Sequence, residues 1–186
     1  RVYILYRMSL ELIVGCMYSG KSSELMRLVN RIQSIQKHYI IYNSSLDTRY
    51  GSRGIFTHNE GHLPCHVVDS LTRQLDSEEF KHADSVFIDE AQFFDDLYEF
   101  CELAVEVYKK DVFVIGLDGD SDRENFGQIH KLLPICDNIT KLKALCSQCK
   151  DGTPGIFSKK IINSSQKVDI GTTDKYIAVC RECYLK

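Results

Sequence analysis

The sequence has 186 residues, of which 44% are hydrophobic and 26% are charged, and its net charge is −3. These proportions are typical of a globular protein with a full core and exclude an intrinsically disordered chain. The slightly acidic charge and the absence of a basic run argue against a nucleic-acid binder. Because no apolar run approaches the roughly 20 residues of a membrane-spanning helix, we expect a cytoplasmic protein without a membrane partner.

Hydrophobic periodicity divides most of the chain into short apolar runs, which predict buried strands, and amphipathic stretches, which predict helices. The first seven residues are too short and too charged for a signal peptide, and the fold is expected to start near Ser9. We expect strands at residues 9–15, 38–43, 63–69, 85–90 and 111–120, helices at 22–38, 71–83 and 95–110, and a long polar loop at 44–62. This alternation predicts an α/β fold with a mostly parallel sheet, whose ligands gather at the carboxyl ends of the strands.

Residues 15–23 read GCMYSGKSS and match the pattern G-x-x-x-x-G-K-[ST] between a predicted strand and a predicted helix. In that context the backbone N–H groups face phosphate oxygens, the lysine reaches the β- and γ-phosphates, and the next hydroxyl binds Mg²⁺. The alternative is an ordinary glycine-rich turn, but a chance match usually lacks the flanking strand and helix. We therefore predict a phosphate site made of Gly15, Met17, Tyr18, Ser19, Gly20, Lys21, Ser22 and Ser23.

Asp89 and Glu90 end the predicted strand at residues 85–90. A carboxylate at a strand end commonly accompanies a phosphate loop, because it helps to hold Mg²⁺ beside the phosphates. We therefore predict that Asp89 and Ser22 hold Mg²⁺. Glu90 is a candidate general base, since a carboxylate can take a proton from a substrate hydroxyl. The alternative for both residues is a solvated strand end.

Four of the eight cysteines form two C-x-x-C pairs, CSQC and CREC. Four thiolates around one ion make a closed tetrahedral zinc site, which has no open position for water and is therefore structural. The pairs lie farther apart than the roughly 15 to 20 residues of common zinc ribbons, which predicts a long excursion between two short strands. Two redox pairs or structural thiols are the alternatives. We predict Zn²⁺ at Cys146, Cys149, Cys180 and Cys183, in a small domain at residues 141–186 that follows an α/β domain at residues 9–140.

Five segments occur in an order that is known for one family: GCMYSGKSSELMR, DTRYGSRGIFTH, FIDEAQFFDDLYEFCE, LDGDSDRENFG and DKYIAVCRECY. With these segments the chain resembles the type II thymidine kinases, the cytosolic and viral class that carries a zinc-binding lasso domain. The resemblance implies a P-loop NTPase-like fold and transfer of the γ-phosphate of ATP to the 5′-hydroxyl of thymidine or deoxyuridine. It also implies a homotetramer, often inhibited by thymidine triphosphate.

The resemblance implies roles for individual residues as well. Lys21 would hold the phosphates, Ser22 and Asp89 would hold Mg²⁺, and Glu90 would be the base on the 5′-hydroxyl. Asp47, Arg49 and Gln92 match positions near the phosphates and the sugar, although the first two also fit a solvated turn. The lasso, from about residue 150 to 173, would close over the nucleoside. The nucleoside pocket would be formed by Met17, Phe93, Leu117, Ser121, Phe126, Ser158, Val168, Asp169, Ile170, Gly171 and Tyr176.

Several positions depart from the family pattern: Cys16 replaces the usual proline of the cradle, Ser121 replaces the usual phenylalanine of the base pocket, and Asp120 and Asp122 are also unusual. Loss of an aromatic wall removes about 1–3 kcal/mol of apolar contact with the thymine methyl group, which predicts a relaxed preference for thymidine. A related deoxynucleoside kinase with altered base preference is therefore one alternative. The other is a nucleotide-switched zinc-ribbon binding module, which would need a basic, aromatic surface.

Overall fold

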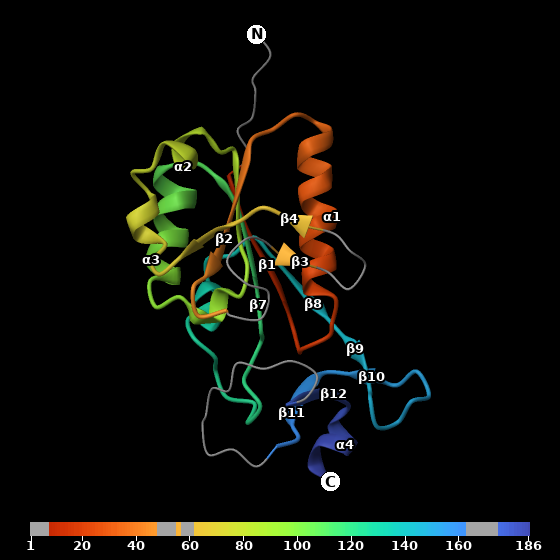
Figure 1. Ribbon diagram of the computed structural model, residues 1–186. Coiled ribbons are helices and arrows are strands. Elements are labelled where there is room, and N and C mark those ends of the chain that lie inside the picture. The colour runs from red at the N-terminus through yellow and green to blue at the C-terminus, as the bar shows by residue number, and fades with distance from the viewer. Residues whose placement is uncertain (1–7, 48–54, 57–61, 163–174) are drawn as a thin grey trace.

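The computed structural model describes residues 8–47, 55–56, 62–162 and 175–186 (Figure 1). Its main body is a sheet with strands β1 (Ser9–Gly15), β2 (Tyr39–Ser44), β5 (His66–Val68), β6 (Ser85–Ile88), β7 (Asp111–Gly116) and β8 (Asn138–Leu142). The strands are all parallel and lie in the order β5-β2-β6-β7-β1-β8. The predicted α/β class and the predicted parallel sheet are confirmed.

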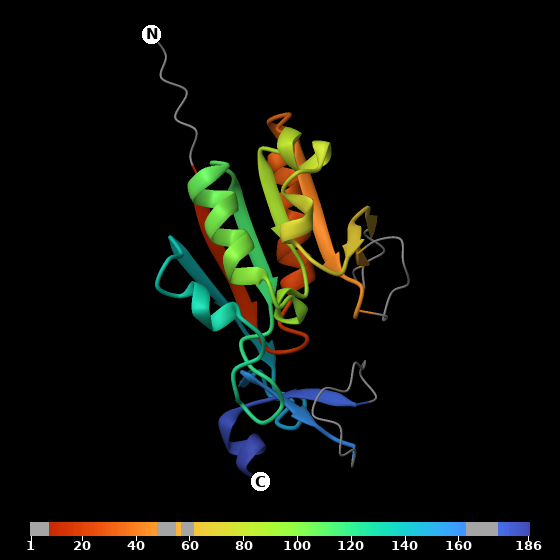
Figure 2. The same ribbon diagram turned by 90° about the vertical axis from the view of Figure 1, so that its left-hand side faces the viewer.

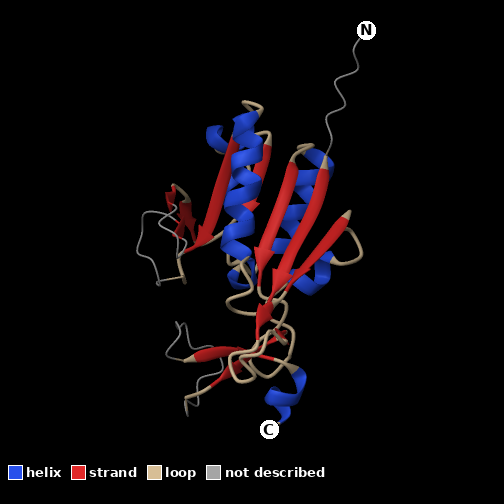
Figure 3. Ribbon diagram, turned by 90° about the vertical axis from the view of Figure 1, so that its right-hand side faces the viewer, coloured by secondary structure: helices blue, strands red, loops and turns tan. Residues whose placement is uncertain are grey.

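Helices cover both faces of this sheet, with α1 (Lys21–Ser34) on one face and α2 (Glu78–His82) and α3 (Leu97–Glu102) on the other (Figures 1 and 3). Successive residues of a strand point to opposite faces, so β1 contributes to two cores. Its residue Leu12 packs in the cluster that contains Phe100 of α3, whereas Ile13 packs in the cluster that contains Leu25 of α1. The near-continuous apolar strands therefore reflect burial on both sides.

The strands expected at 85–90 and 111–120 end earlier, at Ile88 and Gly116, and all three predicted helices also differ in their limits from the observed ones. The helix expected at 22–38 ends at Ser34, and the helix expected at 95–110 is α3 followed by a π-helical turn at Leu103–Val107. The helix expected at 71–83 is broken into a 3₁₀ turn at Thr72–Gln74 and α2. The break occurs because the Ser77 hydroxyl accepts a hydrogen bond from the Phe80 N–H and so starts a new helix.

The strand expected at 63–69 is split into β4 (His62–Leu63) and β5. Pro64 lies between the two pieces, and a proline cannot donate a ladder hydrogen bond. β4 pairs antiparallel with β3 (Ile55–Phe56), which lies inside the stretch expected to be a loop at 44–62. Most of the remaining loop is outside the described residues.

The C-terminal part lies beyond the carboxyl ends of β1 and β7 (Figures 1 and 2). Its elements are β9 (Ala144–Leu145), β10 (Pro154–Gly155), β11 (Phe157–Lys160), β12 (Tyr176–Val179) and α4 (Arg181–Leu185). β9 pairs antiparallel with β10, and β11 pairs antiparallel with β12. Two antiparallel strand pairs therefore face the sheet edge at which ligands are expected. Among the described helices, none has the length and apolar character that crossing a membrane would require.

Candidate active site and metal centre

The loop between β1 and α1 folds into an open cradle because two of its positions require glycine. Gly20 has a φ of 87°, in the left-handed region that side chains disfavour. A Cβ at Gly15 would lie 2.6 Å from the Leu142 carbonyl oxygen and 2.7 Å from Ser19 Oγ. Since α1 begins at Lys21, the N-terminal end of the helix lies at this loop, where the helix dipole favours an anion.

The polar groups of the cradle fit phosphate oxygens. Lys21 is only 9% exposed, and its Nζ donates to the Cys16 carbonyl oxygen at 2.9 Å, which holds the ammonium inside the loop. The hydroxyl of Ser19 is buried and has no hydrogen-bond partner among the described residues, as expected of a group that binds a ligand. Ser22 and Ser23 lie in the first turn of α1, in the same segment as Lys21.

The acidic pair follows β6, and in the sheet only β7 separates β6 from β1. Asp89 is 5% exposed, and its N–H donates to the Tyr42 carbonyl oxygen at 2.8 Å, which extends the β2–β6 pairing by one residue. Glu90 is partly buried and has a left-handed backbone, with φ 49° and ψ 41°. The Asp89 carboxylate and the Ser22 hydroxyl are both oxygen ligands, the type that Mg²⁺ prefers.

A second connection joins the acidic pair to the loop after β7. Gln92 is 3% exposed, its Nε2 donates to Glu90 Oε2 at 2.5 Å, and its Oε1 accepts from the Leu117 N–H at 3.1 Å. The rings of Phe93 and Phe126 meet edge to face, with their centroids 5.5 Å apart. The structure therefore brings together the candidate base and three of the residues expected to form the nucleoside pocket.

The cradle also contacts the C-terminal part. The Met17 N–H donates to Ser158 Oγ at 2.9 Å, and the Cys16 thiol donates to the Gly155 carbonyl oxygen at 3.3 Å. Burial raises the pKa of the Cys16 thiol. Tyr176, another expected pocket residue, is buried in β12, the strand that pairs with the one carrying Ser158. The loop between β1 and α1 thus shares direct hydrogen bonds with β10 and β11.

Ser121 lies where the loop after β7 meets α4. Its carbonyl oxygen accepts a hydrogen bond from the Tyr184 hydroxyl at 2.7 Å. The Arg123 guanidinium lies over the Tyr184 ring, 4.5 Å from the ring centroid, and 5.7 Å from the centroid of Phe157. Arg123 and Tyr184 both lie within segments that resemble the thymidine kinases, but no sequence signal gave either a role, because their partners are distant in the chain.

Asp47 ends the described segment after β2, where its carboxylate accepts a hydrogen bond from Asn43 Nδ2 at 3.3 Å. Five of the predicted site residues lie outside the described residues, namely Arg49, Val168, Asp169, Ile170 and Gly171.

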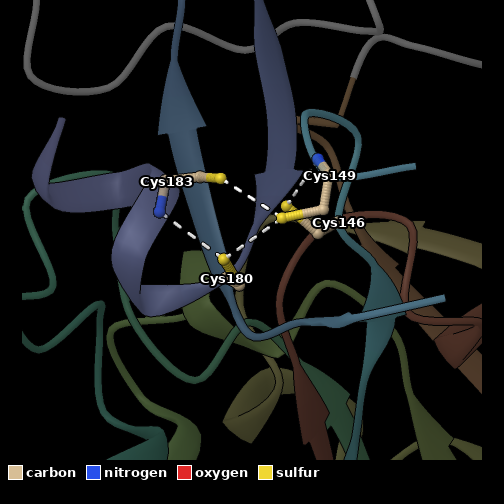
Figure 4. A group of neighbouring side chains, drawn as sticks. All are labelled: Cys146, Cys149, Cys180 and Cys183. Atoms are coloured by element: carbon tan, nitrogen blue, oxygen red, sulfur yellow. Dashed lines mark hydrogen bonds between the residues drawn. The ribbon is translucent and has the colours of Figure 1, made fainter. Parts of the chain in front are cut away.

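The four motif cysteines form one cluster, in which all the sulfur atoms lie within 4.8 Å of one another (Figure 4). Cys149 Sγ is 3.8 Å from Cys180 Sγ and 3.5 Å from Cys183 Sγ. A tetrahedral zinc site with Zn–S bonds of about 2.3 Å has its sulfurs about 3.8 Å apart, so the cluster has the size to bind a metal ion such as Zn²⁺. The two C-x-x-C pairs, far apart in sequence, are thus brought to one site.

Each C-x-x-C pair uses the same local hydrogen bond. The Cys149 N–H donates to Cys146 Sγ, and the Cys183 N–H donates to Cys180 Sγ, both at 3.5 Å. A donated N–H favours the thiolate, and the N–H of Cys149 is the main cause that lowers the pKa of Cys146 to about 6. In the second pair, Cys180 precedes α4 and serves as its N-cap. At Cys146 the backbone therefore favours the thiolate, the form that binds a metal ion, whereas contacts with the neighbouring thiols raise the pKa of Cys149.

Comparisons with known proteins find relatives along almost the whole chain. The family model described as thymidine kinase matches residues 8–184. The chain is 38% identical over 182 residues to the thymidine kinase of Myxoma virus (strain Uriarra), covering 97% of this chain and 98% of the viral protein. It is 36% identical over 184 residues to the cytosolic thymidine kinase of Gallus gallus, covering 97% of this chain and 78% of that protein. It is also 36% identical over 184 residues to a thymidine kinase of Oryza sativa subsp. japonica, covering 97% of this chain and 67% of that protein.

Proposed function

Because the chain belongs to the thymidine kinase family, we propose that it transfers the γ-phosphate of ATP to the 5′-hydroxyl of thymidine or deoxyuridine. The observation that carries the proposal is the position of two groups at one edge of the sheet. The phosphate cradle follows β1 and the acidic pair follows β6, with only β7 between them. A triphosphate in the cradle would therefore approach a hydroxyl group held at the acidic pair.

Each residue of the two groups has a role in the proposed reaction. The amides of the cradle and Lys21 hold the phosphates of ATP, while Ser22 and Asp89 hold Mg²⁺, which neutralises phosphate charge when bound. Glu90 accepts the proton of the 5′-hydroxyl. The 5′-oxygen then forms a bond to the γ-phosphorus, the bond from that phosphorus to the β-phosphate oxygen breaks, and ADP leaves.

The remaining residues shape the substrate sites in this proposal. Asp47, Arg49 and Gln92 lie near the phosphates and the sugar. A lid formed by the lasso excludes water, which prevents hydrolysis of ATP. The nucleoside is enclosed by Met17, Phe93, Leu117, Ser121, Phe126, Ser158, Val168, Asp169, Ile170, Gly171 and Tyr176.

The proposal also covers the bound metal ion, the roles of the two domains and the oligomeric state. Zn²⁺ at the four cysteines has a structural role, because four thiolates leave no position for water or substrate. The α/β domain at residues 9–140 binds ATP, and the domain at residues 141–186 carries the lasso. From the resemblance to the type II enzymes, the protein is a cytoplasmic homotetramer that thymidine triphosphate inhibits.

Phosphate transfer from labelled ATP tests the proposal. With Mg²⁺ present and the zinc site intact, thymidine or deoxyuridine should be converted to its 5′-monophosphate. If neither nucleoside leads to consumption of ATP, the proposal fails. The Glu90→Ala variant should retain ATP binding and lose turnover by about 10²–10⁴-fold, the typical contribution of a general base. Turnover near that of the wild type would remove the assignment of Glu90 as the base.

One observation favours a second candidate, a deoxynucleoside kinase with altered base preference. Ser121 offers no aromatic ring at a position where the family uses one, and its carbonyl oxygen is bound to Tyr184. A kinase assay across the natural nucleosides separates the candidates. Turnover of deoxycytidine or a purine nucleoside with kcat/KM at least equal to that of thymidine would support the second candidate.

A further inference from the structure

We propose that Gln92 is a positioning residue, whose side-chain amide fixes the Glu90 carboxylate relative to the Leu117 backbone. Through this bridge, the group that accepts the substrate proton is tied to the segment that forms one wall of the nucleoside pocket. The inference rests on the proposed function, because it concerns the same reaction, and it changes the role of Gln92 from a substrate contact to a support for the base.

The two hydrogen bonds of Gln92 define a single orientation of its amide. A carboxylate only accepts hydrogen bonds and a backbone N–H only donates them. Nε2 must therefore face Glu90 Oε2, and Oε1 must face the Leu117 N–H, as observed at 2.5 Å and 3.1 Å. A rotation of the amide by 180° would bring oxygen against oxygen at one end and N–H against N–H at the other. The two hydrogen bonds therefore fix the position of the Glu90 carboxylate relative to the Leu117 backbone.

The surroundings of Gln92 are shaped to hold it. A Cβ at Gly116 would lie 2.7 Å from Gln92 Oε1, and a Cβ at Gly127 would overlap the Gln92 carbonyl oxygen. Two glycines from β7 and the loop after it therefore let the backbone approach the buried glutamine. Because Gln92 is only 3% exposed, its rotamer is restricted by close packing and its orientation is well defined.

Glu90 needs such a support because its own backbone is in an unfavourable conformation. Its φ of 49° lies in the left-handed region, which residues other than glycine, asparagine and aspartate seldom occupy. Residues persist there only where the surrounding structure fixes them, and such residues cluster at functional sites. The bond from Gln92 is one of the interactions that can fix Glu90, and it acts directly on the carboxylate.

The positioning role is tested by replacing Gln92 with methionine, which keeps the length of the side chain and removes both hydrogen bonds. We expect kcat for thymidine to fall by about ten- to a hundredfold, since displacement of a reacting group by about 1 Å can cost that much. The KM for thymidine should stay within about twofold of the wild-type value, because no substrate contact is removed. A glutamine that bound the sugar or phosphates would instead raise KM.

A double-mutant cycle separates this role from a general structural one. In the Glu90→Ala background, Gln92→Met should cause little further loss of kcat, because Gln92 acts through a carboxylate that is no longer present. Independent losses that multiply would overturn the proposal. The Gln92→Glu variant keeps an acceptor for the Leu117 N–H but places a carboxylate against Glu90, so kcat should fall, and repulsion between the two carboxylates should also lower the melting temperature.

Gln128 provides a matched control, because it is also a glutamine that bridges two segments of this region. Its Oε1 accepts from the Tyr98 N–H at 2.9 Å and its Nε2 donates to the Asp95 carbonyl oxygen, but it does not bind Glu90. Gln128→Met should lower the melting temperature and leave kcat within about twofold of the wild-type value. An equal loss of kcat in Gln128→Met and Gln92→Met would point to general loosening of the region.

The outcomes distinguish this inference from the proposed function. If the wild type transfers no phosphate to any nucleoside, the proposed function fails and the inference fails with it. If the wild type is active and Gln92→Met retains its kcat, only the positioning role is wrong. If both Gln92→Met and Gln92→Glu fail to fold, Gln92 is a structural residue and the positioning role is again wrong.

Discussion

The hydroxyl of Tyr184 donates a hydrogen bond to the carbonyl oxygen of Ser121 at 2.7 Å and so joins α4 to the loop after β7. Tyr184 directly follows Cys183, one of the four clustered cysteines. The loop that begins after β7 contains Leu117 and Phe126, both expected in the nucleoside pocket. The geometry of the metal centre is therefore connected to the proposed substrate site through one side chain.

The Tyr184→Phe variant tests that connection, since it removes only the hydroxyl and keeps the ring on which Arg123 stacks. We expect the free energy of unfolding to fall by about 0.5–1.5 kcal/mol, the usual net contribution of one hydrogen bond. The KM for thymidine should rise about two- to fivefold with little change in kcat, because the pocket loop is less well positioned. Steady-state kinetics and urea denaturation measure both effects.

Tyr98→Phe is the control for this prediction. It also removes one tyrosine hydroxyl, which donates to Glu102 at 3.2 Å on the surface of α3. The KM for thymidine should not change in this variant. A rise in KM of equal size in both variants would contradict a specific role of the Tyr184 hydroxyl.

Replacement of Cys146 and Cys183 by serine should release the metal ion, because two thiolates cannot maintain a tetrahedral site. Metal analysis of the purified wild type should find about one zinc per chain, and the double variant should retain little. The midpoint of thermal unfolding should fall at the same time. Cys136→Ser, at a partly buried cysteine outside the cluster, should keep its zinc. Full zinc occupancy in the double variant would show that the four cysteines do not share one site.

Lys21→Ala should lower kcat/KM on the order of 10²–10³-fold, because an ammonium group held inside the cradle no longer neutralises the transferred phosphate. Arg27→Ala is a control on the same helix, since the exposed Arg27 side chain forms an ion pair with Glu24 of the same helix. Its kcat/KM should match that of the wild type. The assay is phosphate transfer at saturating and limiting ATP, and an unchanged kcat/KM in Lys21→Ala would exclude the lysine from the phosphate site.

The carboxylate of Asp96 should make the free energy of unfolding depend on pH in the acidic range. Burial acts to raise the pKa of Asp96, but hydrogen bonds from the Thr72 N–H and from the hydroxyls of Ser70 and Thr72 outweigh burial and lower it. A lowered folded-state pKa stabilises the protein above the unfolded-state pKa of about 3.9, and this stabilisation is lost as the pH falls further. Asp96→Asn should therefore be less stable than the wild type by about 1 kcal/mol at pH 7, after allowance for solvent screening.

Measurements of stability at a series of pH values test the role assigned to the Asp96 carboxylate. Urea denaturation should show the difference between the wild type and Asp96→Asn shrinking as the pH is lowered below about 4. A difference that stays constant with pH would mean that the charge of Asp96 is not what stabilises the loop before α3. A more stable variant at pH 7 would contradict the direction of the pKa shift.

The features that the sequence predicts well are those encoded by neighbouring residues. The cradle is one nine-residue pattern, the parallel strands are short apolar runs, and each cysteine pair is a local motif. The clustering of the two pairs was predicted from chemistry, because four thiolates suit one ion. The break before α2 was missed, since the helical spacing of apolar residues outweighed the local capping signal of Ser77.

The features that could not be predicted depend on contacts between distant residues. The bond from Gln92 to Leu117 spans 25 positions, and the bond from Tyr184 to Ser121 spans 63. All four residues lie in the quoted family segments, but no periodicity or spacing marks Gln92 and Leu117, or Tyr184 and Ser121, as partners. Both glutamine and tyrosine have many potential partners in a chain of this length, and only the tertiary structure selects one.

Because the thiol of Cys16 is buried between the loop after β1 and the C-terminal part, its chemical reactivity can report on the contact between them. It is 1% exposed and donates to Gly155 in the C-terminal part, and burial keeps it in the unreactive protonated form. Alkylating reagents should therefore modify Cys16 only in molecules whose C-terminal part has moved away from the cradle. The labelling rate of this one thiol, followed by peptide mass analysis, is a natural probe of how often the two parts separate and of whether nucleotides slow that separation.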